Sequence, residues 1–79
     1  MHIVIESVVS TDDPTDITHE VIKICDTIDE AEGIYNKYIN KDINNRYDDI
    51  EELSSTTNNS SFKNEDFYIN IQIYDYFPI

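Results

Sequence analysis

Alternating apolar and polar residues predict three β-strands. Segment 67–76 alternates Phe and Ile with Tyr, Asn and Gln, which is the pattern of a half-buried antiparallel strand with its Phe/Ile side in a core. Segment 2–9 is short and rich in β-branched residues, and segment 17–25 alternates as well. Between them, residues 10–16 have the Asp and Pro content of a turn. On the second strand, the side that we expect in the core carries Glu20, Ile22 and Ile24.

A single main helix is predicted to begin at Thr27. Thr27 and Glu30 have the spacing of a capping box, in which each side chain bonds the backbone N–H of the other residue. We expect this helix to end near Asn40, with a possible second helical turn at 46–53. Its apolar face is formed by residues at three- and four-residue spacing, namely Ile28, Ala31, Tyr35, Tyr38 and Ile39.

Segment 54–64 is rich in Ser, Thr and Asn, and we expect it to be a flexible loop. The expected fold class is therefore α+β. It has a small antiparallel sheet of about three strands in the order β-β-α-β, with one main helix packed on one face. The opposite face is expected to expose tyrosines and polar groups. Residues 1–79 are expected to form one domain.

Charge is the second strong signal, because the chain has 17 Asp and Glu residues but only five Lys and Arg residues. The formal net charge is −12. Both halves of the chain carry an equal share of it, so the excess does not have the form of an acidic tail. A net charge this far from zero destabilises a compact state but accelerates association with partners of opposite charge.

Closely spaced carboxylates give the leading candidate for a binding site. On a helix, residues three or four apart have Cβ atoms about 5–6 Å apart, which is similar to the spacing of phosphates along a DNA strand. Exposed tyrosines of the last strand would add anchors of a type that is enriched at protein interfaces. Simple solubility of the chain is the alternative explanation of the charge. The candidate partner-binding residues are Asp26, Asp29, Glu30, Asp48, Asp49, Glu51, Glu52, Tyr68, Tyr74 and Tyr76.

Metal binding and catalysis have weaker support. If the first two strands form a hairpin, His2 lies opposite Cys25 and next to Asp26, while His19 lies at the far end. A structural zinc ion normally has four ligands, so we expect no cofactor, although zinc at His2, Cys25 and Asp26 is the alternative. With one glycine in the chain there is no phosphate-binding glycine-rich loop, and we expect no enzymatic activity.

Composition also limits the location and the partners. One cysteine excludes an intramolecular disulfide and suits a reducing cytoplasm, and we recognise neither a signal peptide nor a membrane-spanning segment. Anionic lipids would repel so acidic a surface. Direct binding to nucleic acid is disfavoured because it requires a patch of Lys and Arg. A basic protein in the bacterial cytoplasm is therefore the expected partner.

In its size, its charge, its single cysteine and its short α+β pattern, the chain resembles the small acidic inhibitors made by bacteriophages and mobile elements. That class includes anti-CRISPR proteins and DNA-mimic inhibitors of nucleases. The resemblance implies a non-enzymatic inhibitor that occludes a basic nucleic-acid-handling protein, with a Cas nuclease as the leading target. The alternatives are an acidic immunity protein or antitoxin that neutralises a basic nuclease toxin, and a small acidic structural or regulatory module.

Overall fold

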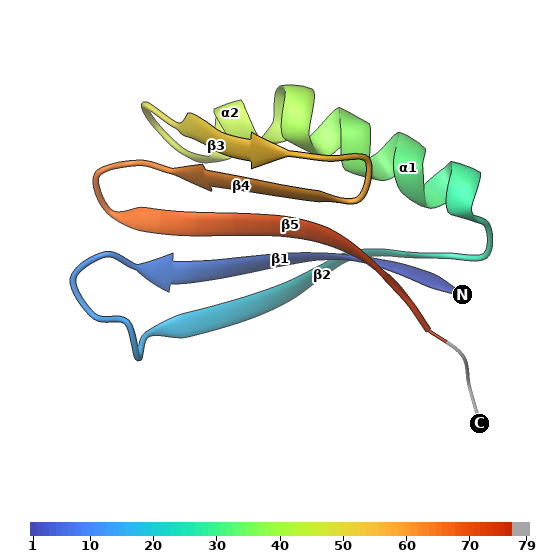
Figure 1. The fold of residues 1–79 in the computed structure, drawn as a ribbon, viewed down its shortest axis with the longest axis horizontal. Coiled ribbons are helices and arrows are strands. Elements are labelled where there is room, and N and C mark those ends of the chain that lie inside the picture. Colours follow the sequence, from blue (N-terminus) through green and yellow to red (C-terminus); the bar gives the residue numbers. More distant parts are fainter. Residues whose placement is uncertain (77–79) are drawn as a thin grey trace.

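A five-stranded antiparallel sheet forms the body of the molecule in the computed structural model, which describes residues 1–76 (Figure 1). The strand order is β2-β1-β5-β4-β3, so the last strand in sequence is the central one. It pairs with the first strand along its whole length. The strands are β1 His2–Ser10, β2 Ile17–Cys25, β3 Glu51–Ser55, β4 Asn59–Lys63 and β5 Phe67–Asp75.

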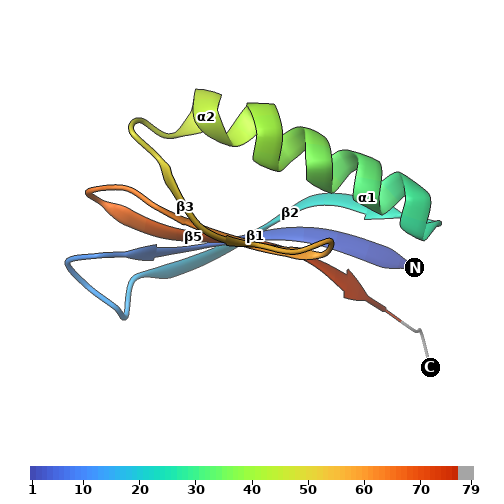
Figure 2. The ribbon, with the colours of Figure 1, turned by 45° about the horizontal axis from the view of Figure 1, so that its top comes forward.

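The helical layer covers one face of this sheet (Figure 2). It consists of α1 Ile28–Lys37, the π-helical segment η1 Tyr38–Asp42 and α2 Ile43–Arg46, which follow one another without a break. The predicted start is confirmed, because the hydroxyl of Thr27 accepts a hydrogen bond from the backbone N–H of Glu30 at 3.2 Å. This bond satisfies one of the free N–H groups of the first helical turn.

The π-helical segment explains why the helix passes the predicted end at Asn40. Within it the backbone N–H of Ile43 bonds the carbonyl of Tyr38, five residues earlier. The extra residue in this turn shifts the helical phase, so that Ile43 faces the sheet together with Tyr38. The predicted helical turn at 46–53 is wrong, because α2 ends at Arg46 and a strand begins at Glu51.

The expectation of about three strands is also wrong, although the α+β class is correct. The two additional strands, β3 and β4, occupy much of the segment 54–64 that we expected to be a flexible loop. Serine replaces apolar residues on their inner side, and these hydroxyls are satisfied by partners. Ser60 is fully buried and bonds both Ser55 and the hydroxyl of Tyr35, which itself donates to the carbonyl of Thr56 at 2.9 Å. A Ser-rich segment can therefore form strands with a core-facing side when such partners exist.

The core lies between the helical layer and the sheet. The predicted orientation of β5 is confirmed, with its Ile residues fully or almost fully buried and Phe67 partly buried. The sheet contributes six of the buried apolar residues and the helical layer four, and together they are Val4, Cys25, Ala31, Tyr35, Tyr38, Ile43, Phe62, Ile69, Ile71 and Ile73.

The predicted core side of β2 has the correct orientation for Glu20 and Ile22 but is wrong for Ile24. Glu20 pairs with the inward-facing Glu6, and Ile22 packs against the core. Ile24 is 55% exposed, while Cys25 from the opposite set is buried. A register shift explains this result, because Val4 pairs with Lys23 whereas Ile5 pairs with Val21. The β-bulge between these pairs inserts one residue and reverses the alternation along the strand.

The sheet face away from the helices is here called the open face. Within residues 1–76 no helix or loop covers it, as Figure 2 shows. Because paired residues of neighbouring strands point to the same side, the registers assign its members. Tyrosines of β5 occur there as predicted, but an aliphatic surface also lies on β1 and β2. The apolar members are Ile3, Ile5, Val9, Ile17, Val21, Ile24, Tyr68 and Tyr74.

Replacement of Gly33 by Ala is expected to stabilise the protein by about 1 kcal/mol, because glycine in a helix interior is less favourable than alanine by that amount. The residue is exposed inside α1, and a Cβ atom there would meet no atom within 4 Å. Chemical denaturation of the Gly33→Ala variant measures the effect. Glu32→Ala, at the neighbouring exposed position, is the control and should change stability by less than about 0.5 kcal/mol. Lower stability of Gly33→Ala would contradict the prediction.

Candidate functional site

Three connecting segments meet at one end of the sheet (Figure 1). They are the β1–β2 turn, the α2–β3 loop and the β4–β5 turn. The β4–β5 turn lies between the other two. Thr11 in the β1–β2 turn donates its backbone N–H to the carbonyl of Asp66 at 2.9 Å and its hydroxyl to the carbonyl of Glu65 at 3.0 Å. On the other side, Asn64 donates from its side-chain amide to the carbonyl of Asp48 at 3.1 Å.

These segments, with the first residue of β3, collect eight exposed carboxylates, nearly half of the acidic residues of the chain, in what is here called the acidic end. Five of them were not among the predicted partner-binding residues, because they are far apart in sequence. Hydrogen bonds between turns, which sequence periodicity does not reveal, bring them together. The residues of the acidic end are Asp12, Asp13, Asp16, Asp48, Asp49, Glu51, Glu65 and Asp66.

Local hydrogen bonds hold one of these carboxylates, that of Asp13, in place. Asp13 accepts from the hydroxyl of Thr15 at 2.6 Å and from its backbone N–H at 3.0 Å. These bonds, the side-chain bond first, lower the pKa of Asp13 below its usual value and so favour its charged form. Asp49 has a φ of 52°, in the left-handed region that Asp tolerates better than most residues.

A shallow hollow of about 380 Å³ lies between the α2–β3 loop and the β4–β5 turn. Its lining includes the rings of Tyr47 and Phe67, which meet edge to face with centroids 6.0 Å apart, and Arg46, whose guanidinium lies 6.0 Å from the centre of the Tyr47 ring. Four carboxylates also line the hollow and are here called its acidic rim. The four acids are Asp48, Asp49, Glu65 and Asp66.

The predicted acidic residues do not form one surface. Asp26, Asp29 and Glu30 lie at the start of α1, and the helical layer then runs for 19 residues, roughly 28 Å, to the acidic end. The predicted helical row of carboxylates at 48–52 is absent, because these residues form a loop and a strand. On that strand Glu51 pairs with Lys63 and Glu52 pairs with Phe62, so the two side chains point to opposite faces.

The predicted tyrosine anchors lie elsewhere. Tyr68 and Tyr74 belong to the open face and are 50% and 44% exposed. Tyr76 is half-exposed just beyond β5, where its backbone N–H donates to the carbonyl of Met1 at 2.8 Å. Of these three side chains, only Tyr68 also borders a hollow that includes members of the acidic end.

The possible metal residues have other surroundings. His2 does pair with Cys25, as the hairpin prediction required. However, the Nδ1 atom of His2 lies 2.6 Å from a carboxylate oxygen of Asp75, and Cys25 is only 1% exposed. Burial, with the nearby Glu30 carboxylate second, raises the pKa of the Cys25 thiol and disfavours the thiolate that would bind zinc. In the part of the chain that the structure describes, no group of three or more His, Cys, Asp or Glu residues could hold a metal ion.

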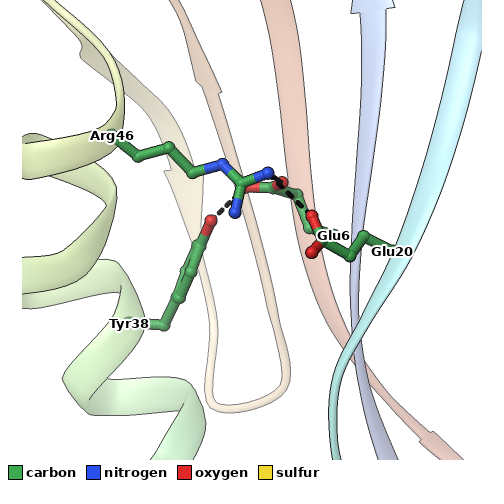
Figure 3. Close-up of polar contacts among 4 residues, drawn as sticks. All are labelled: Glu6, Glu20, Tyr38 and Arg46. Carbon is green, nitrogen blue, oxygen red and sulfur yellow. Dashed lines mark hydrogen bonds and ion pairs between the residues drawn. The ribbon is translucent and has the colours of Figure 1, made fainter.

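A polar cluster with two buried members, Glu6 and Tyr38, and two exposed members, Glu20 and Arg46, connects the helical layer to the sheet next to the acidic end (Figure 3). Glu6, in β1, is 1% exposed and accepts a hydrogen bond from the hydroxyl of Tyr38. The Nη2 atom of Arg46 lies 3.4 Å from Glu6 and 2.7 Å from Glu20 on β2. A sequence signal for this cluster existed, since Glu6 interrupts the otherwise apolar inner side of a predicted strand.

The cluster changes the ionisation of its members. Burial, followed by the hydrogen bond to Glu6, raises the pKa of Tyr38 far above its usual value. The bond to Glu20 raises the pKa of Arg46 and keeps this side chain charged. Burial, with the Glu6 carboxylate second, raises the pKa of Tyr47 to about 12. All three effects favour the protonated forms and make the cluster a structural contact at neutral pH.

Comparisons with protein-family models, with curated proteins and with solved structures found no match for this chain. Within the described residues, no helix is long and apolar enough to cross a membrane.

The Tyr38→Phe variant is expected to be less stable by about 1–3 kcal/mol, because it leaves the buried carboxylate of Glu6 without its hydroxyl donor. Urea denaturation measures the loss. Tyr76→Phe, which removes an exposed hydroxyl, is the control and should differ from the parent protein by less than about 0.5 kcal/mol. Equal stability of the two variants would show that the contact between Tyr38 and Glu6 contributes nothing.

Stability is expected to fall as the pH rises from about 10 to about 12, owing in part to Tyr47. Below pH 10 the phenol is protonated in both states. Between these values the unfolded state releases the proton while the folded state retains it, so the free energy of unfolding falls with pH. The Tyr47→Phe variant should show a shallower decline in its urea midpoint over this interval, and Tyr76→Phe should show none of this change. An unaltered slope for Tyr47→Phe would exclude its contribution.

Proposed function

We propose that this protein is a non-enzymatic inhibitor that places its acidic end on a basic surface of a nucleic-acid-handling protein, with a nuclease such as a Cas effector as the leading partner. The observation that supports the proposal is the convergence of eight exposed carboxylates, seven from three separate connecting segments and one, Glu51, from the first position of β3. A charged cluster of this kind creates a local potential that attracts a cationic groove and orients the molecule as it approaches.

Few cations of the chain itself offset this charge. Lys63 lies 3.9 Å from Glu51, and Arg46 is directed to Glu6 and Glu20. Like charges at close range destabilise the folded state, and a cationic partner would relieve that repulsion. The acidic end therefore has more to gain electrostatically from binding than the start of α1, where the positive end of the helix dipole and Thr27 already stabilise the acids.

The hollow beside Tyr47 and Phe67 suits a single basic side chain of the partner. Arginine combines a planar cation, which stacks on aromatic rings, with donors that bind carboxylates in pairs. An Arg side chain in this hollow would meet the acidic rim and the ring of Phe67 together, next to the Tyr47 ring that Arg46 of the chain already contacts. Phosphate groups of nucleic acid carry the same charge as the rim, so the proposed partner is the protein that binds nucleic acid and not the nucleic acid itself.

Neutralisation of the hollow's rim is expected to weaken inhibition at least tenfold. The variant combines Asp48→Asn, Asp49→Asn, Glu65→Gln and Asp66→Asn, which keep side-chain size and remove four charges. A panel of purified basic nucleases, Cas effectors first, is assayed for DNA cleavage, and affinity is measured at low and high salt. Binding by the parent protein should weaken as salt rises, because screening reduces the attraction between exposed charges.

The matched control removes four charges from the opposite end of the helical layer through Asp26→Asn, Asp29→Asn, Glu30→Gln and Glu32→Gln. It has the same net charge as the first variant, so it separates local placement from overall charge. We expect it to inhibit within about threefold of the parent protein, since its substitutions lie roughly 28 Å away. Greater loss in the control, or affinity that does not depend on salt, would refute binding through the acidic end.

A further inference from the structure

We propose that the open face binds a second copy of this chain, so that two sheets pack face to face. The first observation is the exposure of large apolar side chains on the outer strand. Ile17, Val21 and Ile24 are 51%, 53% and 55% exposed, and cross-strand neighbours on β1 extend this apolar surface. Clustered apolar side chains on both sides of a narrow polar band, on an otherwise acidic protein, are a marker of an interaction site.

Charge indicates what kind of partner fits. Of the 17 acidic residues, only Glu51 lies on the strand positions of the open face, and its neighbour there is Lys63 at 3.9 Å. The face is thus formally neutral on a chain whose net charge is −12. A basic partner would find nothing there to attract it. A second copy can approach along this face with only Glu51, paired with Lys63, as an acidic residue on its strand positions.

Five polar residues of the open face, namely Ser7, His19, Asn59, Ser61 and Asn70, are already paired with one another. The hydroxyl of Ser7 lies 2.7 Å from Nδ1 of His19, and the side-chain amide of Asn70 donates to Asn59 at 2.6 Å and to Ser61 at 3.2 Å. Removing water from polar groups that already hydrogen-bond each other costs little free energy. The polar band across the middle of the face is therefore compatible with burial against another apolar sheet.

The area is sufficient for a specific dimer. Three strands of nine residues and two of five residues, at about 3.3 Å per residue and about 4.8 Å between strands, give the face a plan area of roughly 600 Å². A standard-size interface buries about 800 Å² of solvent-accessible surface on each partner. Because side chains make a surface uneven, the accessible area of the open face is larger than its plan area. Face-to-face packing of this sheet is thus within the range of stable homodimers.

Repulsion between the acidic ends selects one of the two simple twofold arrangements. A twofold axis along the strands would place both acidic ends at the same end of the dimer. An axis across the strands places them at opposite ends of a particle whose protomers are each 38 Å long. In this second arrangement β2 of one copy covers β2 of the other, Ile17 meets Ile24 of the second copy, and Tyr68 meets Tyr74.

Edge-to-edge pairing through β2 is the competing arrangement, and the chain opposes it. The bulge at Ile22 interrupts the regular spacing of hydrogen-bonding groups, and Lys23 adds a charge to this edge. Both features are devices by which natural sheets prevent edge pairing. Face-to-face packing needs neither a regular edge nor a free strand.

Sedimentation equilibrium from about 1 to 200 μM tests the proposal, since interfaces of this size commonly associate in that range. We expect a species of twice the 9.3 kDa chain mass. Ile24→Lys and Tyr74→Lys should each weaken association at least tenfold. The control is Ile28→Lys, which adds the same charge at an exposed apolar position of α1 and should change association less than twofold. Circular dichroism confirms that each variant is folded.

The outcomes distinguish every alternative. A monomer throughout the concentration range, or equal weakening by Ile28→Lys, would overturn the proposal. Loss of association in Ile24→Lys but not in Tyr74→Lys would show edge pairing through β2, because Tyr74 lies on the central strand. Salt separates this proposal from the one for the acidic end: screening should preserve or tighten the dimer, whereas it should weaken binding of a basic partner. Either proposal can therefore fail alone.

Discussion

The hydrogen bond from Tyr38 to the buried carboxylate of Glu6 determines how the two layers of this protein fit together. A charged group removed from water requires its partners, because the low dielectric of the interior makes an unpaired charge very unfavourable. Glu6 lies on β1, while its partners Tyr38 and Arg46 lie on the helical layer. Their positions require the π-helical segment between them and define where α2 ends. The α2–β3 loop therefore starts beside the β4–β5 turn. This position brings Asp48 and Asp49 next to Glu65 and Asp66.

Local patterns in the sequence predicted the elements whose stability is local or whose two sides differ strongly. The alternation of Phe and Ile on β5 and the cap at Thr27 are of this kind. Strands β3 and β4 could not be predicted, because their stability comes from hydrogen bonds to distant partners such as the one between Ser60 and Tyr35. The reversed sides of β2 depend on a bulge, which alternation alone does not locate.

Prediction of the candidate site failed for a related reason. Carboxylates were grouped by their spacing along a helix, but the structure groups them by the end of the sheet that they share. Asp48 and Asp49 belong to both groupings, whereas Glu65 and Asp66 join them only through the β4–β5 turn. The neutrality of the open face was equally hidden, since it appears only when the strand order places Val9, Tyr68 and Lys63 in one row across the sheet.

The separation of the neutral open face from the acidic remainder makes each chain a compact amphiphile. The way in which the protein associates with itself in solution therefore depends on pH. At neutral pH the charged remainder keeps the particles apart in every orientation except the one that joins the open faces. Near the isoelectric point of about 4.1 that restriction disappears while the apolar surface is unchanged. Contacts between particles then lose their directionality, and the ordered pairing of two faces gives way to precipitation.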